Sequence, residues 1–267
     1  MAEKMNALSA KEWLQTSFTI WRDIKKTKEE ARLQHPAMFP SALAEKLIKT
    51  YTRDNGEVIF DPFAGVGSTL IAAKKLNKKG LGIELNQEFV RIIKERLSQT
   101  ILDKKRATYK SEIFCGDAKR IAEYVKNESV DLCINSPPYW DILNQKRTVD
   151  NRKIGNYSDS DKDLGNVKDY KEFLNGLKEV YSGVYNVLKP NKRCCIVVMD
   201  IRKKDKFYPF HVDITKVMEE IGFELEEFII WDRQHEYNNM KTLGYPWVFR
   251  FNRVHEFICI FWKRAKR

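Results

Sequence analysis

"EVIFDPFAGVGSTLIAAKKL", which runs from Glu57 to Leu76, decides the fold. A short apolar run ends in a turn that contains Gly65 and Gly67, and a second apolar stretch follows. This order predicts a buried strand, a tight turn and a helix. Because glycine lets the backbone approach a ligand at a helix N-terminus, the turn also predicts a binding site. Leu70 occupies the third glycine position of a dinucleotide fingerprint, so a pyrophosphate ligand is disfavoured.

The rest of the chain continues this alternation of strands and helices. Further strands are expected at residues 79–84, 112–117, 131–134, 193–201, 223–231 and 255–262. Helices are expected at residues 41–51, 87–97, 168–188 and 212–221, the first of them capped by Ser41. The pattern predicts a Rossmann-like α/β fold with a seven-stranded, mostly parallel sheet. The last two strands lie too close for a crossover helix, which predicts one antiparallel strand near the sheet edge.

Composition bounds the class of protein. The 267 residues are 43% hydrophobic, which suits one domain with insertions, and the formal charge of +11 favours a polyanionic partner such as nucleic acid. The five cysteines show no CxxC or Cys/His spacing, so we expect reduced, buried thiols and no metal site. Without a signal-peptide pattern or an apolar run long enough to span a bilayer, we expect a cytoplasmic protein with no membrane partner.

Two acidic residues are expected beside the glycine turn. Glu84 closes the second strand and Asp117 the third, so both lie at the sheet edge that carries the turn. Glu84 is placed to accept hydrogen bonds from two ribose hydroxyls, and Asp117 from an adenine amino group. Either acid alone is more often a helix cap or a solvated strand end. Together with the turn they predict a site for S-adenosylmethionine, an adenosine that bears a zwitterionic tail.

A second motif, "INSPPYWDIL", spans Ile134 to Leu143 and follows the fourth strand. Its prolines must end the strand, because proline cannot donate to a strand ladder. The Ser136 hydroxyl and the Pro137 carbonyl can accept hydrogen bonds from an exocyclic amine, while Pro138 stiffens the turn. Tyr139 offers a flat face for a base that has left its stack. A proline-rich turn with an aromatic plug is the structural alternative.

These motifs resemble those of the amino-methyltransferases that modify cytosine N4 or adenine N6 in DNA. "DPFAGVGST" is similar to their cofactor motif, "NSPPYW" to their catalytic motif, and "HPAMFP" (residues 35–40) to a segment that closes over the cofactor. "RVHEFICIFWK" (residues 253–263) is similar to their late strand near the target base. The resemblance covers residues 35–263, with the cofactor motif first. The cofactor-binding residues that it implies are His35, Met38, Phe39, Asp61, Phe63, Gly65, Gly67, Ser68, Thr69, Glu84 and Asp117.

The resemblance implies a class I S-adenosylmethionine-dependent methyltransferase that modifies a short site in double-stranded DNA by base flipping and direct transfer. Serine at position 136 is the form usual in the cytosine-N4 enzymes of the family. We therefore expect N4-methylcytosine as the product, with adenine N6 as the alternative. An RNA base methyltransferase and a catalytically silent DNA-binding subunit are further alternatives. No cysteine follows a proline, so cytosine-C5 chemistry is disfavoured.

We expect two parts in the chain. Residues 1–34 are a helical extension, and residues 35–267 are the catalytic domain, with candidate target-recognition loops at 141–169 and 232–253. Side chains suited to phosphates, base edges or stacking gather in and beside these loops. The candidate DNA-binding residues are Trp140, Lys146, Arg147, Arg233, Asn238, Asn239, Arg250 and Arg253. We also expect association with the nucleoid through DNA, and a cognate restriction endonuclease and a homodimer are possible partners.

Overall fold

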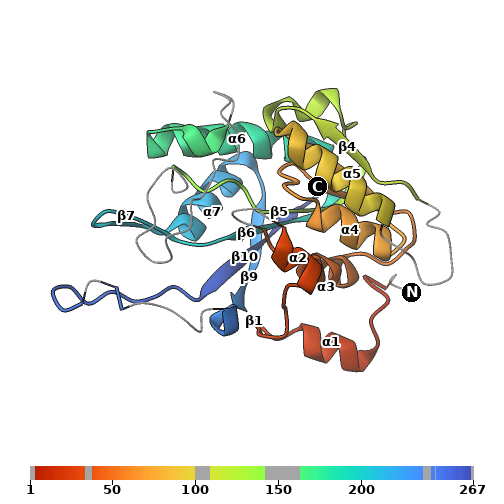
Figure 1. The fold of residues 1–267 in the computed structure, drawn as a ribbon. Coiled ribbons are helices and arrows are strands. Elements are labelled where there is room, and N and C mark those ends of the chain that lie inside the picture. Colours follow the sequence, from red (N-terminus) through yellow and green to blue (C-terminus); the bar gives the residue numbers. More distant parts are fainter. Residues whose placement is uncertain are drawn as a thin grey trace.

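The fold is built on one large sheet (Figure 1). The computed structural model describes residues 4–33, 38–99, 109–141, 163–236, 242–243 and 245–265. The sheet has eight strands in the order β1-β9-β10-β6-β5-β2-β3-β4. Their bounds are β1 Ile20–Trp21, β2 Val58–Asp61, β3 Lys79–Glu84, β4 Glu112–Cys115, β5 Val130–Asn135, β6 Leu188–Val198, β9 Glu224–Asp232 and β10 His255–Lys263. A separate two-stranded hairpin contains β7 Ile201–Lys203 and β8 Lys206–Tyr208.

Strand directions confirm the predicted mixed sheet. β4, β3, β2, β5 and β6 are parallel neighbours, whereas β10 is antiparallel to both β6 and β9. The short strand β1 adds to the outer edge of β9 in parallel, pairing Ile20 with Ile230 and Trp21 with Trp231. The seven strands expected from the sequence are all present. β1 is an unpredicted eighth strand, and it lies in the segment expected to be helical.

Helices cover both faces of the sheet (Figure 1). They are α1 Ala10–Thr16, α2 Lys28–Arg32, α3 Ser41–Tyr51, α4 Ser68–Lys75, α5 Gln87–Gln99, α6 Tyr170–Val187 and α7 Phe210–Ile221. One apolar cluster joins α6 and α7 to the sheet, and another joins α3 and α4 to its opposite face. Successive strand residues such as Cys194 and Cys195 belong to opposite clusters, because side chains alternate across a strand. This two-sided burial explains the nearly continuous apolar runs of the strands.

Two sequence-based expectations need correction. Ser41 is the first residue of α3 and not its cap, since Pro40 precedes the helix and the Ser41 backbone N–H donates to the Glu30 carboxylate at 2.8 Å. The expectation that every thiol is buried is wrong for Cys115, which is exposed, while Cys133, Cys194, Cys195 and Cys259 are buried. Among the described residues, no helix has both the length and the apolar character needed to cross a membrane.

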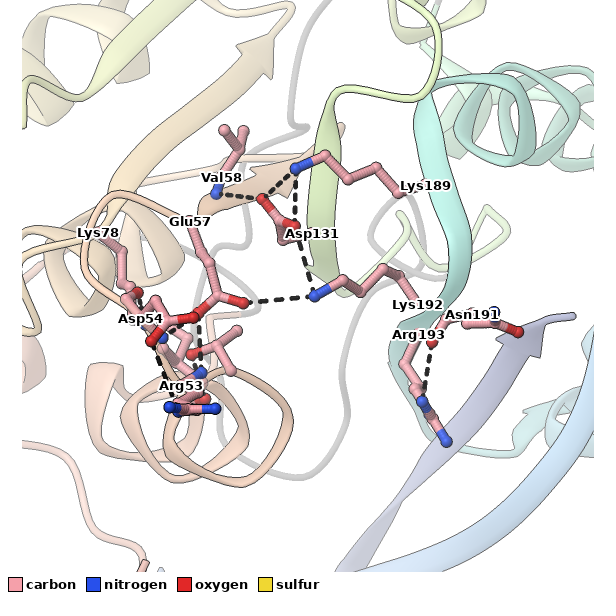
Figure 2. Close-up of polar contacts among 12 residues, drawn as sticks. Arg53, Asp54, Glu57, Val58, Lys78, Asp131, Lys189, Asn191, Lys192 and Arg193 are labelled. Atoms are coloured by element: carbon pink, nitrogen blue, oxygen red, sulfur yellow. Dashed lines mark hydrogen bonds and ion pairs between the residues drawn. The ribbon is translucent and has the colours of Figure 1, made fainter. Parts of the chain in front are cut away.

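A charge network fixes the strands at their amino ends, away from the candidate site (Figure 2). The Asp131 carboxylate accepts a hydrogen bond from the Val58 backbone N–H at 3.0 Å and pairs with Lys189 Nζ at 2.8 Å. Glu57 Oε2 accepts from Lys78 Nζ at 2.8 Å, and Glu57 Oε1 lies 3.3 Å from Lys192 Nζ. The network thus connects the starts of β2, β3, β5 and β6.

Substituting Asp131 with alanine is expected to lower the free energy of unfolding by about 2–3 kcal/mol. The change leaves the Val58 N–H without its hydrogen-bond acceptor. Lys189 is partly exposed, so its ammonium group can be hydrated again. The loss of stability therefore stays below that of breaking a fully buried ion pair. Urea unfolding checks this value. Asp23→Ala is the control, because Asp23 pairs with Lys46 at the surface and its loss should cost about 0.5 kcal/mol or less. Equal losses in the two variants would contradict a structural role for the network.

Candidate active site

A cleft opens at the carboxyl ends of β2, β3, β4 and β5. The empty volume of the cleft is about 850 Å³, which includes solvent-filled space at its open mouth. The predicted site residues that line it are Met38, Phe39, Phe63, Gly65, Ser68, Glu84, Asp117, Ser136 and Pro138. Residues from the predicted cofactor motif, from both acidic strand ends and from the proline motif therefore share one cavity.

The turn after β2 needs its glycines. Gly67 has a φ of 87° and immediately precedes α4. A Cβ at Gly67 would lie 2.9 Å from the Ile93 side chain, so a larger residue would both strain the backbone and clash. Gly65, with a φ of 54°, donates its backbone N–H to Glu84 Oε2 at 2.8 Å. The turn is thus fixed directly to the acid at the end of β3.

Glu84 lines the cleft with a partly buried carboxyl group. Its second carboxylate oxygen accepts from the Asn86 backbone N–H at 2.8 Å. Burial is the main cause that raises the pKa of Glu84 to about 7, with a smaller contribution from the carboxylates of Asp61 and Asp163, while the hydrogen bonds from the Asn86 and Gly65 N–H groups act in the opposite direction. The Glu84 carboxyl therefore changes its charge near neutral pH, at the position predicted for the ribose contact.

Asp61 and Thr69 lie behind the cleft and do not line it. Both are buried, and the Thr69 hydroxyl donates to Asp61 Oδ2 at 2.7 Å and lies 3.4 Å from the Ile134 carbonyl oxygen. Asp61 also accepts from the Phe63 backbone N–H at 3.0 Å, and burial raises its pKa to about 7. These residues connect the glycine turn to the end of β5. Their placement supports a positioning role in place of the predicted direct cofactor contact.

Asp117 lines the cleft two residues after the end of β4. One oxygen of its carboxylate accepts from the Lys119 backbone N–H at 2.9 Å and so begins the 3-10 helix Ala118–Glu123. The cap and the cleft position coexist, because a carboxylate has two oxygens and about four acceptor positions. The neighbouring Gly116 N–H donates to the Glu84 carbonyl oxygen at 2.9 Å, which holds the two acidic strand ends together.

The proline motif begins at an anchored residue. The Asn135 side chain is fully buried and accepts a hydrogen bond from the Tyr181 hydroxyl at 2.7 Å. Ser136, the next residue, lines the cleft together with Pro138, whereas Pro137 is buried. No local sequence signal selects Asn135, because its role depends on a tyrosine of α6.

The aromatic pair of the motif departs from expectation. Tyr139 is only 8% exposed, packs edge-on against Phe210 and directs its hydroxyl toward Glu256 at 3.4 Å. Trp140 is 4% exposed and packs against Tyr170 and other core rings. The expected open stacking face of Tyr139 and DNA contact of Trp140 are therefore corrected: both rings lie in the core in this structure.

The predicted DNA-binding arginines lie at the same sheet edge but have intramolecular partners. Arg233 pairs with Glu236 at 2.6 Å and with Glu256. Arg250 pairs with Asp205 at 2.8 Å, and Arg253 lies with its guanidinium 5.9 Å from the Phe207 ring centroid. Other predicted site residues fall outside the described ranges, namely His35, Lys146, Arg147, Asn238 and Asn239.

The cleft also contains residues that no sequence motif singles out. Two of them, Asp163 and Leu164, belong to the carboxyl-terminal part of the segment 141–169. Val180 lines the cleft from α6. Asp163 is 6% exposed and caps the short 3-10 helix Leu164–Asn166 through the Gly165 N–H at 2.8 Å. The sequence Asp-Leu-Gly-Asn is a cap signal. It does not reveal that the loop returns to the cofactor motif.

Curated relatives share limited segments with the chain. The orphan methyltransferase M.BamHII of Bacillus amyloliquefaciens is 40% identical over 93 residues, which cover 33% of this chain and 35% of that protein. The Type II methyltransferase M.HpaI of Haemophilus parainfluenzae is 39% identical over 66 residues, which cover 25% of this chain and 21% of that protein. The chain thus matches about a third or less of the length of these relatives.

A solved structure and a family model extend the comparison to most of the chain. An S-adenosylmethionine-dependent methyltransferase from Methanosarcina mazei is 14% identical, with a TM-score of 0.53, and the match covers 82% of this chain and 98% of that one. The expected methyltransferase fold is thereby confirmed. The DNA methylase family model, which describes N6 and N4 methyltransferases, matches residues 2–95 and 130–267, and the chain therefore belongs to this family.

Proposed function

We propose that this protein transfers a methyl group from S-adenosylmethionine to the exocyclic N4 amine of cytosine in duplex DNA. One observation carries the proposal: Ser136 and Pro138 line the same cleft as Gly65, Glu84 and Asp117. Family membership supports methyl transfer to a base amine of DNA. The formal charge of +11 supports a polyanionic substrate.

The cleft fits the proposed cofactor. Ser68 lines it, and the buried Ser68 hydroxyl has no hydrogen-bond partner among the described residues, which leaves a polar group for a ligand. Glu84 and Asp117 offer carboxylate oxygens at neighbouring strand ends for ribose hydroxyls and an adenine amine. Met38 and Phe39 add an apolar wall. When bound, S-adenosylmethionine supplies an electrophilic methyl group on a positively charged sulfur.

Ser136 and Pro137 act on the base amine. The amine lone pair is delocalised into the ring, so the nitrogen becomes nucleophilic only when its protons are held out of the ring plane. The Ser136 hydroxyl and the Pro137 carbonyl are the acceptors for these protons, and Asn135 holds the turn through Tyr181. The contribution of the chain is therefore orientation and hydrogen bonding, without a covalent enzyme intermediate. Stacking by Tyr139 requires its ring to leave the packing against Phe210.

Cytosine N4 is preferred over adenine N6 because position 136 is serine. A hydroxyl is a weaker acceptor than a carboxylate or amide oxygen, and serine is the form usual in N4 enzymes that the chain resembles. Adenine N6 is the second candidate, since both amines present the same pair of protons to the motif.

Product analysis tests the proposal. Duplex DNA of varied sequence is incubated with the protein and methyl-labelled S-adenosylmethionine, digested to nucleosides and analysed by mass spectrometry. We expect N4-methylcytosine. Detection of N6-methyladenine would show that adenine, and not cytosine, is the target base. Methyl incorporation into total RNA alone would show that the substrate is RNA. Cofactor binding by calorimetry without any transfer would indicate a catalytically silent subunit. A cognate endonuclease, a homodimer, cytoplasmic location and nucleoid association stay predictions.

Cofactor affinity is expected to fall about tenfold between pH 8 and pH 6. Protonation of Glu84, whose pKa is raised to about 7, removes acceptor capacity for the ribose, so affinity declines as pH falls through this value. Calorimetric titration with S-adenosylmethionine across this range measures the profile. Glu84→Gln should bind more weakly and lose most of the dependence, and Asp61→Asn separates the contribution of the second acid. A flat wild-type profile would show that Glu84 does not titrate in the binding step.

A further inference from the structure

Two projecting segments flank the catalytic motif. We name residues 201–208 the basic hairpin and residues 245–251 the aromatic arm. The hairpin follows β6 and the arm precedes β10. β6 runs parallel to β5, and β9 runs in the same direction because β10 is antiparallel to both. Both segments therefore leave the sheet at the edge where Ser136 follows β5. Figure 1 shows β7 and the blue segment before β10 extending from the same side of the molecule.

The aromatic arm presents large apolar rings to solvent. Its most exposed side chains are Tyr245 (78%), Trp247 (89%), Phe249 (85%) and Phe251 (82%). Phe249 and Phe251 touch edge to face, with ring centroids 5.1 Å apart, so they form one patch. Rings of this size are normally buried, and a contiguous exposed group of them marks a surface that a partner covers.

The basic hairpin supplies the charge next to these rings. Its charged side chains are Arg202, Lys203, Lys204, Asp205 and Lys206. Asp205, the acidic residue among them, forms an ion pair with Arg250 of the aromatic arm at 2.8 Å. Arg253 lies over the Phe207 ring of the hairpin, and its Nε has no hydrogen-bond partner among the described residues. The Asp205–Arg250 pair thus brings the two segments into contact, and the cations of the hairpin belong to the same surface as the exposed rings.

The basic hairpin is also connected to the catalytic motif. Lys203 Nζ lies 2.7 Å from Asp141 Oδ2 and 3.8 Å from the centre of the Trp140 ring. Asp141 and Trp140 directly follow the Ser-Pro-Pro-Tyr turn. Whatever binds the two segments is therefore held beside the residues proposed to receive the flipped base.

We propose that the basic hairpin and the aromatic arm form a DNA clamp in which rings of the arm stack on bases of the duplex opened beside the target. This inference rests on the proposed function and assigns a surface to it. The hairpin lysines neutralise backbone phosphates, and the rings replace stacking lost when a base is extruded. A second copy of this chain is disfavoured as the occupant, because it would bring like charges together, whereas DNA is complementary.

A double variant of the arm tests the stacking. Trp247→Ala/Phe249→Ala should weaken binding of a fluorescein-labelled mixed-sequence duplex by about 5- to 150-fold for each ring that stacks. The matched control is Trp13→Ala/Phe18→Ala, which removes similar rings, 50% and 59% exposed, from the amino-terminal segment. The control should change affinity less than about twofold. Circular dichroism and thermal melting of every variant establish that the fold is intact.

A charge variant tests the hairpin separately. Lys204→Gln/Lys206→Gln should lower the slope of log affinity against log salt by about 1.8, because each phosphate contact contributes about 0.9. The ring variant should leave this slope unchanged while increasing the dissociation constant. This crossed pattern distinguishes stacking from a general loss of surface contact.

The outcomes separate the clamp from the proposed function. Tight binding by the wild type with undiminished binding by the ring variant would overturn the clamp alone. Failure of the wild type to bind duplex DNA would overturn both. Light scattering supplies the remaining outcome: loss of a dimer in the ring variant, with unchanged DNA affinity, would identify a second copy as the occupant and overturn the clamp.

Discussion

Replacing Ser136 with alanine is expected to lower the turnover number for DNA methylation about 100-fold while leaving cofactor affinity within about twofold of the wild type. The hydroxyl is proposed to act on the base amine, so its loss should destabilise the transition state more than the complex with the cofactor. The Pro137 carbonyl remains as one acceptor, which limits the loss. Single-turnover kinetics at saturating cofactor measure the effect, and calorimetry measures the affinity.

The cleft offers a matched serine as the control. Ser68 also lines it, but at the start of α4 beside the glycine turn. Ser68→Ala should weaken cofactor binding by a few-fold and leave the saturated turnover number nearly unchanged, the reverse of the pattern at Ser136. A similar loss of both quantities in both variants would indicate damage to the fold and would remove the assigned role of Ser136.

Substituting Glu84 with alanine is expected to weaken S-adenosylmethionine binding about 100-fold or more. Hydrogen bonds to a charged partner are each worth about 1.5–3 kcal/mol, and the carboxylate is predicted to make two with the ribose. The variant also frees the Gly65 N–H, now held by Glu84 at 2.8 Å, so the glycine turn loses its anchor. Titration calorimetry at pH 8, where the carboxylate is ionised, gives the dissociation constant.

Asp117 provides the comparison for Glu84. It is predicted to contact the adenine amine once, so Asp117→Ala should weaken binding by only about tenfold. Adenosine and adenine serve as ligand fragments: Glu84→Ala should affect adenosine alone, and Asp117→Ala should affect both. An adenine response in the Glu84 variant equal to that in the Asp117 variant would contradict the assignment of ribose to Glu84.

Much of the sheet was predictable because its central strands, such as β5, are buried on both faces. β3 begins and ends where the sequence pattern placed it, and β10 differs from its prediction by one residue at its end. Glycine, acidic and proline residues marked the carboxyl end of each strand around the cleft. Since parallel strands bring these ends to one edge, residues that are far apart in sequence could be assigned to one site.

Other features depend on contacts that local sequence does not encode. The burial of Tyr139 arises from Phe210 and from Glu256, which lies 117 residues away. The hairpin of β7 and β8 consists largely of charged residues and lacks the apolar alternation that signals a strand. Strand β1 has two residues, too few for any periodic pattern. Asp163 lines the cleft although it is distant in sequence from Glu84 and Ser136, a placement that only tertiary structure determines.

Strand β1 bears on where this chain could be shortened. The Thr19 carbonyl accepts from the Ile230 N–H at 2.7 Å, and Trp21 is 2% exposed against the apolar layer beneath α3. Removing residues 1–34 at the expected boundary would strip β9 of this neighbour and uncover a row of unsatisfied backbone groups. Such a row is a template for strand addition between molecules. We therefore expect the amino-terminal segment to protect this sheet edge against self-association between molecules.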